Sequence, residues 1–321
     1  MKHAHSKTAG LRMRVIAAGT AAALLGLGAV GLATSASASA RHHQQQGGFN
    51  KKGDILIADA FNNRVIEINS RHQVVWQFGN GSSVAGPHSI VGTNDVQRVG
   101  SLTLIAGTGT PPGADPSCLK AAGCPDNRVI LVTPAGRIVW QYGKAGVTGS
   151  GFNQLNTPVQ NTYLPSGHIL INDQSNERVI EVTRSHHIVW SYGSPAGTQL
   201  SGAAFASRLP DGNTLITDSN NNRILIVTPG KKVVFDYATN ARPGSMGMPL
   251  PTRAVMLKNG HILISDQFND QVIEINQNQK IVFTQGMIQI DGNGHNQLNA
   301  PYDAKVIGDY TGLTPPFGFG H

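Results

Sequence analysis

The stretch "GDILIADAFNNRVIEIN", residues 53–69, sets an alternating apolar run beside a short polar cluster and then begins a second alternating run. Nearly the same phrase returns as "GHILINDQSNERVIEV" at 167–182, "GNTLITDSNNNRILIV" at 212–227 and "GHILISDQFNDQVIEI" at 260–275. Self-similarity at a fixed spacing indicates a repeat architecture. Because alternation with period two is typical of β-strands, each copy predicts a strand, a tight polar turn and a second strand.

Five units share one register when they are aligned on the position after the polar cluster, which holds Arg64, Arg128, Arg178, Arg223 and Gln271. Twelve residues further on, the units hold Trp76, Trp140, Trp190, Phe235 and Phe283. A further strand is predicted before four units, at 87–92, 158–165, 203–210 and 251–258. The first unit lacks this strand, and a matching segment follows the last unit at 301–308. The sequence therefore predicts an all-β, five-bladed β-propeller of four-stranded blades, one of them closed by both termini, with six blades as the alternative.

The repeated phrases resemble NHL repeats, and "FNQLNTP" and "HNQLNAP" resemble the segment that leads into such a repeat. The resemblance covers roughly residues 47–310 and implies the propeller fold, but it belongs to a repeat and not to an activity. NHL propellers often have six blades, so a count of five departs from that pattern. The tryptophan-rich outer strands also resemble quinoprotein and arylsulfotransferase-like propellers, although no catalytic histidine can be carried over from them.

The polar cluster itself predicts an ion pair across each turn. Asp59, Asp173 and Asp218 each stand five residues before an arginine, so carboxylate and guanidinium can meet while asparagines hold the turn. A catalytic pair has no reason to be copied into each blade, so these pairs are predicted to be structural. Gly107 replaces the aspartate in the second unit, and Gln271 replaces the arginine in the fifth.

The first forty residues run from a basic segment through "VIAAGTAAALLGLGAVGLA" to small residues ending at Ala40. This three-part pattern predicts a secretory signal peptide cut after Ala40, and therefore a secreted protein. An uncleaved N-terminal membrane anchor is the alternative, because the apolar run is long. The predicted domains are a signal peptide at 1–40, a flexible segment at 41–52, the propeller at 53–310 and a C-terminal tail at 311–321.

Charge and cysteine content limit the partners. The formal net charge is +7, and four basic residues lie in the signal segment, which leaves +3 (+7 minus 4) for the rest. This excess gives weak support for nucleic-acid binding, so we predict no nucleic-acid partner, no membrane association after cleavage, and a monomer. Cys118 and Cys124, an even and close pair in an exported chain, predict a disulfide that pins a surface loop.

Residues that differ between blades are the candidates for a site, because the scaffold needs the same residues in every blade. Loops that lead into the inner strands share one propeller face, and long loops on a rigid scaffold often carry function. The inner strands can be aligned on Pro87, Pro158, Ala203, Pro251 and Pro301. The positions that follow, with one histidine from a lead-in loop, give the ligand-binding candidates His88, Gln160, Arg253, Tyr302, Asp303, Lys305 and His295. The alternative is that Arg253, Asp303 and Lys305 only pair with one another to fill a wet channel.

An arginine opposite an aspartate at a channel mouth suits a carboxylate or sugar-hydroxyl ligand. We therefore predict an extracellular scaffold that binds an unknown protein, glycan or small molecule through its loop face and central channel. Whether it is an enzyme is left open, the alternative being a metal-assisted lyase or hydrolase, or an arylsulfotransferase-like enzyme, at the channel mouth. The cofactor is unknown; if a divalent cation binds, His88 and Asp303 are its candidate ligands, and this small set favours a hard cation.

Overall fold

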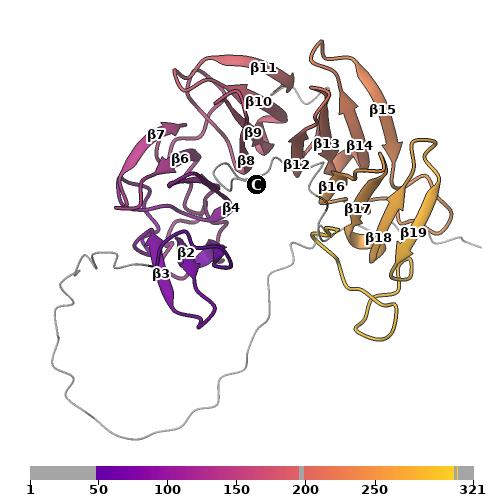
Figure 1. Cartoon of the computed structure of the whole chain (residues 1–321), viewed down its shortest axis with the longest axis horizontal. Helices are drawn as coiled ribbons and strands as arrows, with labels where there is room; N and C mark the ends of the chain where they lie inside the picture. The colour runs from indigo at the N-terminus through magenta and orange to yellow at the C-terminus, as the bar shows by residue number, and fades with distance from the viewer. Residues whose placement is uncertain (1–47, 195–198, 307–308, 310–321) are drawn as a thin grey trace, which may run out of the picture. The chain divides into compact units, whose positions relative to one another are not determined.

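The repeated phrase folds into an antiparallel meander, and five such sheets follow one another along the chain (Figure 1). The computed structural model describes residues 48–194, 199–306 and 309. Within them the first sheet has three strands, β1 (Ile55–Asp59), β2 (Arg64–Ile68) and β3 (Val74–Phe78). The other four sheets have four strands each: β4 (Thr93–Val99), β5 (Leu102–Gly107), β6 (Arg128–Val132), β7 (Ile138–Tyr142); β8 (Pro158–Tyr163), β9 (Ile169–Asp173), β10 (Arg178–Val182), β11 (Ile188–Gly193); β12 (Phe205–Arg208), β13 (Thr214–Asp218), β14 (Arg223–Val227), β15 (Val233–Ala238); and β16 (Arg253–Met256), β17 (Ile262–Asp266), β18 (Gln271–Ile275), β19 (Ile281–Gln285).

The described residues all belong to one of the chain's two units, Gln45–His321. The predicted signal peptide at 1–40, most of the segment at 41–52 and the tail at 311–321 lie outside the described residues. No helix within the described part of the chain has the length and apolarity needed to cross a membrane.

The polar cluster of the repeat forms a tight turn between neighbouring strands, as predicted. In four sheets it is a three-residue 3-10 turn: η1 (Ala60–Asn62), η2 (Gln174–Asn176), η3 (Ser219–Asn221) and η4 (Gln267–Asn269). The residue after each turn has a left-handed backbone, with φ between 51° and 55° at Asn63, Glu177, Asn222 and Asp270. Asparagine and aspartate tolerate this region best among non-glycine residues, which explains why three of the four are Asn or Asp.

The core lies between the sheets, in four buried apolar clusters that each join consecutive sheets. The aromatic residue of the shared register helps to hold three of these joints. The indole N–H groups of Trp76, Trp140 and Trp190 donate to the carbonyl oxygens of Pro134, Arg184 and Pro229 at 2.9, 2.9 and 3.0 Å. Each acceptor lies in the last turn of the following sheet, so the tryptophan binds one sheet to the next.

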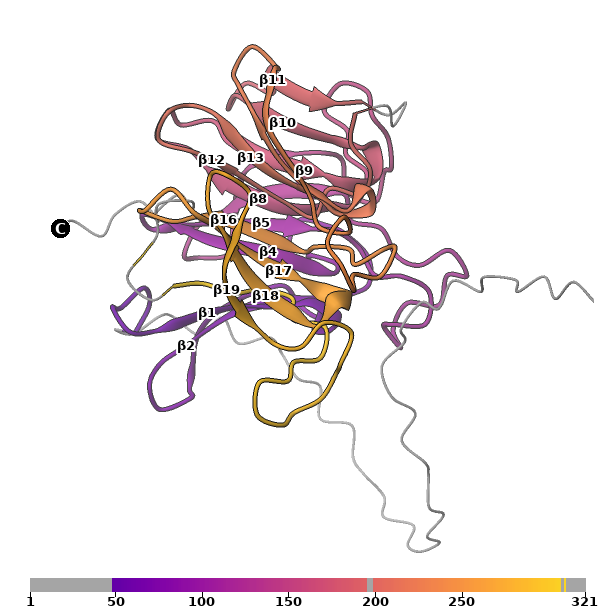
Figure 2. The same ribbon diagram turned by 90° about the vertical axis from the view of Figure 1, so that its right-hand side faces the viewer.

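The inner strands β4, β8, β12 and β16 lie next to one another around the middle of the arc of sheets (Figure 1, Figure 2). The strands predicted at 158–165, 203–210 and 251–258 are found as β8, β12 and β16. The inner strand predicted at 87–92 is wrong, because the second sheet uses β4 instead. The backbone N–H groups just before β4 donate to side chains and not to a neighbouring strand. Val91 donates to Asp126 Oδ2 at 2.7 Å, and Gly92 donates to Asn63 Oδ1 at 2.9 Å.

The segment predicted to complete the first sheet lies along the fifth sheet. Residues 301–306 form no strand and do not pair with β1 in the described residues, and 307–308 lie outside them. Thr252 Oγ1 donates to the Tyr302 carbonyl oxygen at 2.6 Å, and the Lys258 backbone N–H donates to Asp309 Oδ2 at 2.7 Å. The described part of the segment is therefore bonded to the fifth sheet and forms no ladder with the first.

Candidate functional site

The aspartates of the repeat form the predicted structural ion pairs. Asp173 Oδ2 lies 2.7 Å from Arg178 Nε, and its Oδ1 accepts the Asn156 backbone N–H at 2.7 Å. The same pairs form at Asp59–Arg64 (2.7 Å) and Asp218–Arg223 (2.8 Å). Burial raises the pKa of Asp173, and the Arg178 charge and hydrogen bonds oppose that rise. These carboxylates are occupied by the scaffold.

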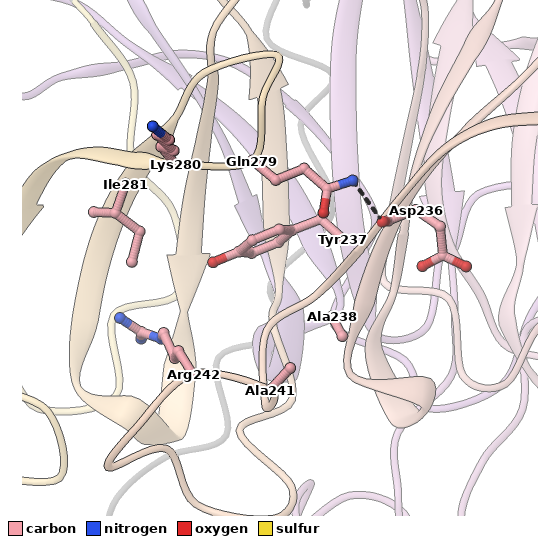
Figure 3. A pocket seen from close by; sticks show the side chains of 8 residues that line it. All are labelled: Asp236, Tyr237, Ala238, Ala241, Arg242, Gln279, Lys280 and Ile281. Carbon is pink, nitrogen blue, oxygen red and sulfur yellow. Dashed lines mark hydrogen bonds between the residues drawn. The ribbon is translucent and has the colours of Figure 1, made fainter.

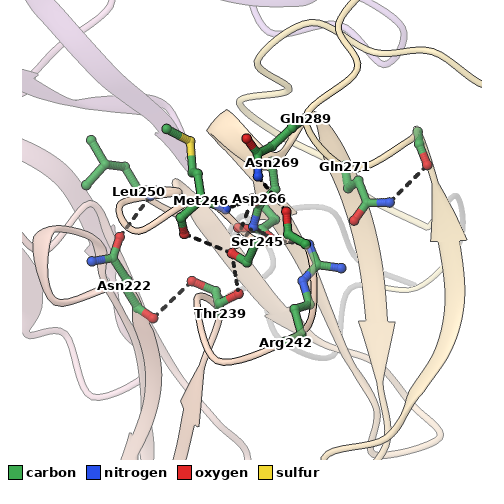
Figure 4. A network of polar contacts seen from close by, with 12 residues as sticks. Asn222, Thr239, Arg242, Ser245, Met246, Leu250, Asp266, Asn269, Gln271 and Gln289 are labelled. Carbon is green, nitrogen blue, oxygen red and sulfur yellow. Dashed lines mark hydrogen bonds and ion pairs between the residues drawn. The ribbon is translucent and has the colours of Figure 1, made fainter.

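The two units that depart from the pattern recover the ion pair by other means. In the second sheet Asp126 replaces the missing aspartate, with Oδ1 at 2.6 Å from Arg128 Nε. A side chain at Gly107 would have no room, because its Cβ would lie 2.8 Å from Asp126 Cγ. In the fifth sheet Arg242, from the loop after β15, pairs with Asp266 (Figure 4). The five-residue spacing of the repeat predicts neither partner, because Asp126 lies only two residues before Arg128 and Arg242 lies in a loop outside the repeat.

The variable positions meet at one end of the inner strands. Asp95, Gln160, Phe205 and Arg253 occupy one register position, opposite Ala106, Asn172, Thr217 and Ser265 of the neighbouring strands. Asp95 was missed because the inner strand of the second sheet was predicted six residues too early, at 87 instead of 93. Three residues of this register position, together with Asn161 and two residues of the C-terminal segment, form what we call the inner-strand cluster. Its members are Asp95, Asn161, Phe205, Arg253, Asp303 and Lys305.

Asp95 links the second and third sheets within this cluster. Its Oδ2 accepts the Asn161 backbone N–H at 2.9 Å and the Asn161 side-chain amide at 3.3 Å. Burial raises the pKa of Asp95, while the Asn161 hydrogen bond and the positive charges of Arg253 and Lys305 act to lower it. A carboxylate of the second sheet therefore interacts electrostatically with cations of the fifth sheet and the C-terminal segment.

Arg253 is held between an aromatic ring and a carboxylate. Its guanidinium carbon lies 4.2 Å above the centre of the Phe205 ring, and its Nε lies 3.0 Å from Asp303 Oδ1. Lys305 also pairs with Asp303. Their side chains are 24%, 35% and 42% exposed for Arg253, Asp303 and Lys305, so all three groups can be reached by solvent. The mutual pairing of these three residues, which the alternative interpretation predicted, is thus present in the structure.

Several buried polar atoms beside the cluster have no hydrogen-bond partner in the described residues: Gln160 Oε1, Asn161 Oδ1, Asn172 Oδ1, Thr217 Oγ1 and Ser265 Oγ. The residues that carry them are at most 4% exposed. Three of them, Asn172, Thr217 and Ser265, stand directly opposite the variable positions of β8, β12 and β16. Because an unpartnered buried polar atom is costly, such atoms mark a place where a ligand or ordered water completes the bonding.

The structure does not bring the histidine candidates into this cluster. His88 and His295 are exposed in the loops that precede β4 and follow β19, and no described contact joins either of them to Arg253 or Asp303. Tyr302 is 61% exposed, although its carbonyl oxygen binds Thr252. The described residues contain no group of three His, Cys, Asp or Glu side chains that could hold a metal ion.

The predicted disulfide joins Cys118 and Cys124 in the loop between β5 and β6. This loop is anchored to the first sheet by Asp115, whose Oδ2 accepts the Asn63 side-chain amide at 2.7 Å. Burial acts to raise the pKa of Asp115, but hydrogen bonds from Ser117 and Asn63 hold it below its usual value. The insertion is therefore fixed to the scaffold at a point remote in sequence.

Comparison with known proteins shows the fold and no family. No protein-family model and no curated protein matches the chain. It is similar to a streptogramin B lyase, at 12% identity and a TM-score of 0.50, over 73% of this chain and 65% of that one. A catalytically inactive alanine variant of virginiamycin B lyase from Staphylococcus aureus, with quinupristin, matches at 15% identity and a TM-score of 0.50, over 72% and 66% of the two chains. A protein of unknown function from Bacteroides caccae matches at 15% identity and a TM-score of 0.48, over 71% of each chain.

The chain covers about two thirds of the length of these two lyases, and at such identities the likeness concerns the fold alone. The meander sheets, their joints and these similarities define the class of protein. It is an all-β protein of the β-propeller class.

Proposed function

We propose that this chain is an exported, NHL-like propeller that serves as a binding scaffold, with its ligand site at the inner-strand cluster. The observation that carries the proposal is the contrast between two sets of charges. The turn ion pair is present in all five sheets, even where its residues have moved, whereas the inner-strand position holds an acid, an amide, a ring and a base in turn. Residues that differ where the scaffold repeats are free to serve a ligand.

A sugar or sugar acid fits the chemistry of the cluster best. Its hydroxyl groups both donate and accept, so they can bind the carboxylates of Asp95 and Asp303 as well as the guanidinium of Arg253. The Phe205 ring offers an apolar surface for a sugar ring beside that guanidinium, and it already orients the guanidinium. The nearby unpartnered amide and hydroxyl oxygens provide further acceptors and donors. Export is supported by the three-part pattern of residues 1–40.

The test is a glycan screen on the purified chain, followed by titration calorimetry with the best binder. Arg253→Ala and Asp303→Ala should weaken binding at least about tenfold, because each loses a charge-assisted hydrogen bond. Both should melt close to the parent, since their side chains are partly exposed. Arg137→Ala, in the exposed turn before β7, is the control and should bind as the parent does.

Full binding by both Arg253→Ala and Asp303→Ala would place the ligand site elsewhere. If the parent converts its ligand to a product, both variants do not, and the purified chain holds one equivalent of metal, the lyase or hydrolase alternative would be favoured instead.

A further inference from the structure

The joint between the fourth and fifth sheets contains a pocket of ≈ 560 Å³ (Figure 3). One wall comes from the end of β15 and the loop after it, and the other comes from the turn before β19 and its first residue. The lining residues are Asp236, Tyr237, Ala238, Ala241, Arg242, Gln279, Lys280 and Ile281. The pocket shares no lining residue with the inner-strand cluster.

A change of aromatic residue removes one hydrogen bond between the sheets at this joint. In the three preceding joints a tryptophan donates its indole N–H to the carbonyl oxygen of a residue in the next sheet's last turn. In the fourth sheet Phe235 takes the tryptophan's place, and the turn residue in the acceptor position is Gln277. Phenylalanine is smaller and has no N–H group, so it cannot make this bond.

A second difference concerns the tyrosine of the wall, Tyr237, which is 7% exposed. In the third sheet the His186 ring packs 5.8 Å from Trp140 and 6.0 Å from Tyr142, measured between ring centres. Gln279 holds the position of His186 in the fifth sheet, and both have a left-handed backbone. Its side-chain amide donates to the Asp236 carbonyl oxygen at 3.0 Å, at the edge of the pocket. No imidazole therefore covers Tyr237, the counterpart of Tyr142.

The walls of the pocket offer donors and one uncompensated positive charge. The two carboxylates nearby are already paired, Asp236 with Arg223 at 3.2 Å and Asp266 with Arg242. Lys280 forms no ion pair in the described residues. The Tyr237 hydroxyl and the Arg242 guanidinium extend toward the same side of the pocket as Ile281 (Figure 3).

The Arg242 guanidinium has an N–H group without a hydrogen-bond partner in the described residues. It reaches Asp266 from a loop outside the strands, through Nη2, and its buried Nε has no partner in the described residues. In the other four sheets the guanidinium comes from the strand after the turn and uses Nε for the aspartate. The fifth sheet thus places a partly unsatisfied guanidinium in a pocket wall.

We propose that this pocket binds a small monocarboxylate, independently of the inner-strand cluster. The carboxylate pairs with the Arg242 guanidinium and accepts from the Tyr237 hydroxyl, and the flexible Lys280 side chain turns toward it to complete the site. The apolar body of the ligand packs against Ile281, Ala238 and Ala241. A single net positive charge at the walls selects a monoanion over a neutral or cationic analogue.

The test uses benzoate as the probe, titrated into the full purified chain and followed by calorimetry. Benzoate should bind saturably, and benzamide, which has the same ring without the charge, should not bind detectably. Lys280→Gln should weaken benzoate binding about tenfold, the usual effect of losing one charge-assisted bond. Lys232→Gln changes the equivalent lysine of the preceding turn and should have no effect.

Phe235→Trp is the decisive variant, because it should restore the bond seen in the other joints. The indole N–H should reach the Gln277 carbonyl oxygen and occupy space at the pocket, so benzoate binding should be lost while the melting temperature rises. Arg253→Ala should bind benzoate as the parent does, which separates this site from the inner-strand cluster.

Several results would overturn the proposal. They are the absence of saturable benzoate binding, equal binding of benzamide, equal affinities of Lys280→Gln and Lys232→Gln, and unchanged affinity in Phe235→Trp. Loss of benzoate binding in Arg253→Ala would also overturn it, because the ligand would then lie at the inner-strand cluster.

Discussion

The turns of the third and fifth sheets carry the same buried carboxylate with different partners. Asp173 and Asp266 are both fully buried, but only the third sheet has an arginine in the next strand. In the fifth sheet Gln271 stands there and donates its amide to the Gly286 carbonyl oxygen at 3.0 Å, so Arg242 supplies the charge (Figure 4). The comparison teaches that the fold requires a guanidinium at each buried carboxylate, and not an arginine at a fixed place in the repeat.

The Oδ1 atoms of Asp173 and Asp266 also differ in their hydrogen bonding. In the third sheet Asp173 Oδ1 accepts the backbone N–H of Asn156, whereas Asp266 Oδ1 has no partner in the described residues. Thr157, which follows Asn156, and Leu250, which follows Pro249, occupy equivalent places in the two sheets. Both have positive φ, and both donate their backbone N–H to an asparagine side chain of the preceding sheet. Pro249 therefore stands where Asn156 stands, and a proline has no N–H to donate. The fifth turn is the less completely bonded of the two.

The largest effect is expected from Asp173→Ala, which would break the fully bonded turn. Arg178, only 9% exposed, would lose its carboxylate, and the Asn156 N–H would lose its acceptor. Breaking such a buried pair costs about 3–5 kcal/mol of unfolding free energy. Urea unfolding measures it, with Asp291→Ala in the exposed loop after β19 as a control expected within about 0.5 kcal/mol of the parent. A loss no greater than that of the control would contradict the structural role of the pair.

A smaller effect is expected from Arg242→Ala, at about 2–4 kcal/mol, because the pair is buried but Asn269 still donates to Asp266 at 2.8 Å. Gln271→Arg in the same chain places a guanidinium where the other sheets have it and should restore at least half of the loss. If the double variant is no more stable than Arg242→Ala, the equivalence of the two arginine positions is wrong.

The pH dependence of Arg242→Ala sharpens this result. Burial raises the pKa of Asp266, and the Arg242 charge opposes the rise. Without Arg242 the pKa of Asp266 in the folded state lies further above its unfolded value. The unfolding free energy lost through the ionised Asp266 is zero below the unfolded pKa, grows as pH rises toward the folded pKa and is complete above it. The stability difference between Arg242→Ala and the parent should therefore shrink in acid. A deficit that grows on acidification would contradict the assignment.

The smallest effect is expected in the second sheet, where the replacement aspartate lies only two residues before its arginine. Changing Cys118 and Cys124 to Ser opens a short loop, which should cost about 1–3 kcal/mol at most because short loops constrain little chain entropy. Asp126 and Arg128 lie outside that loop, so amide exchange in β6 should stay as slow as in the parent. Two reactive thiols in the unreduced chain, or fast exchange throughout β6, would contradict this view.

The parts of the fold that depend on local pattern could be predicted from the sequence. The turns, the tryptophan register and the disulfide follow from short spacings and were found as predicted. The inner strand of the second sheet could not be placed, because the side chains of Asn63 and Asp126 decide where its ladder begins. This error hid Asp95 and placed His88 in the candidate site. Arg242 was missed because its partner is remote in sequence and shares no repeat position.

The joints between sheets have a consequence for how the chain folds. Each tryptophan bonds to the sheet that follows it in the chain, and each buried cluster joins sequence neighbours. A sheet and its successor can therefore form without waiting for the far end of the chain, and the entropy of closing each loop stays small. We therefore expect folding to grow along the chain from any sheet, and the end sheets to unravel first.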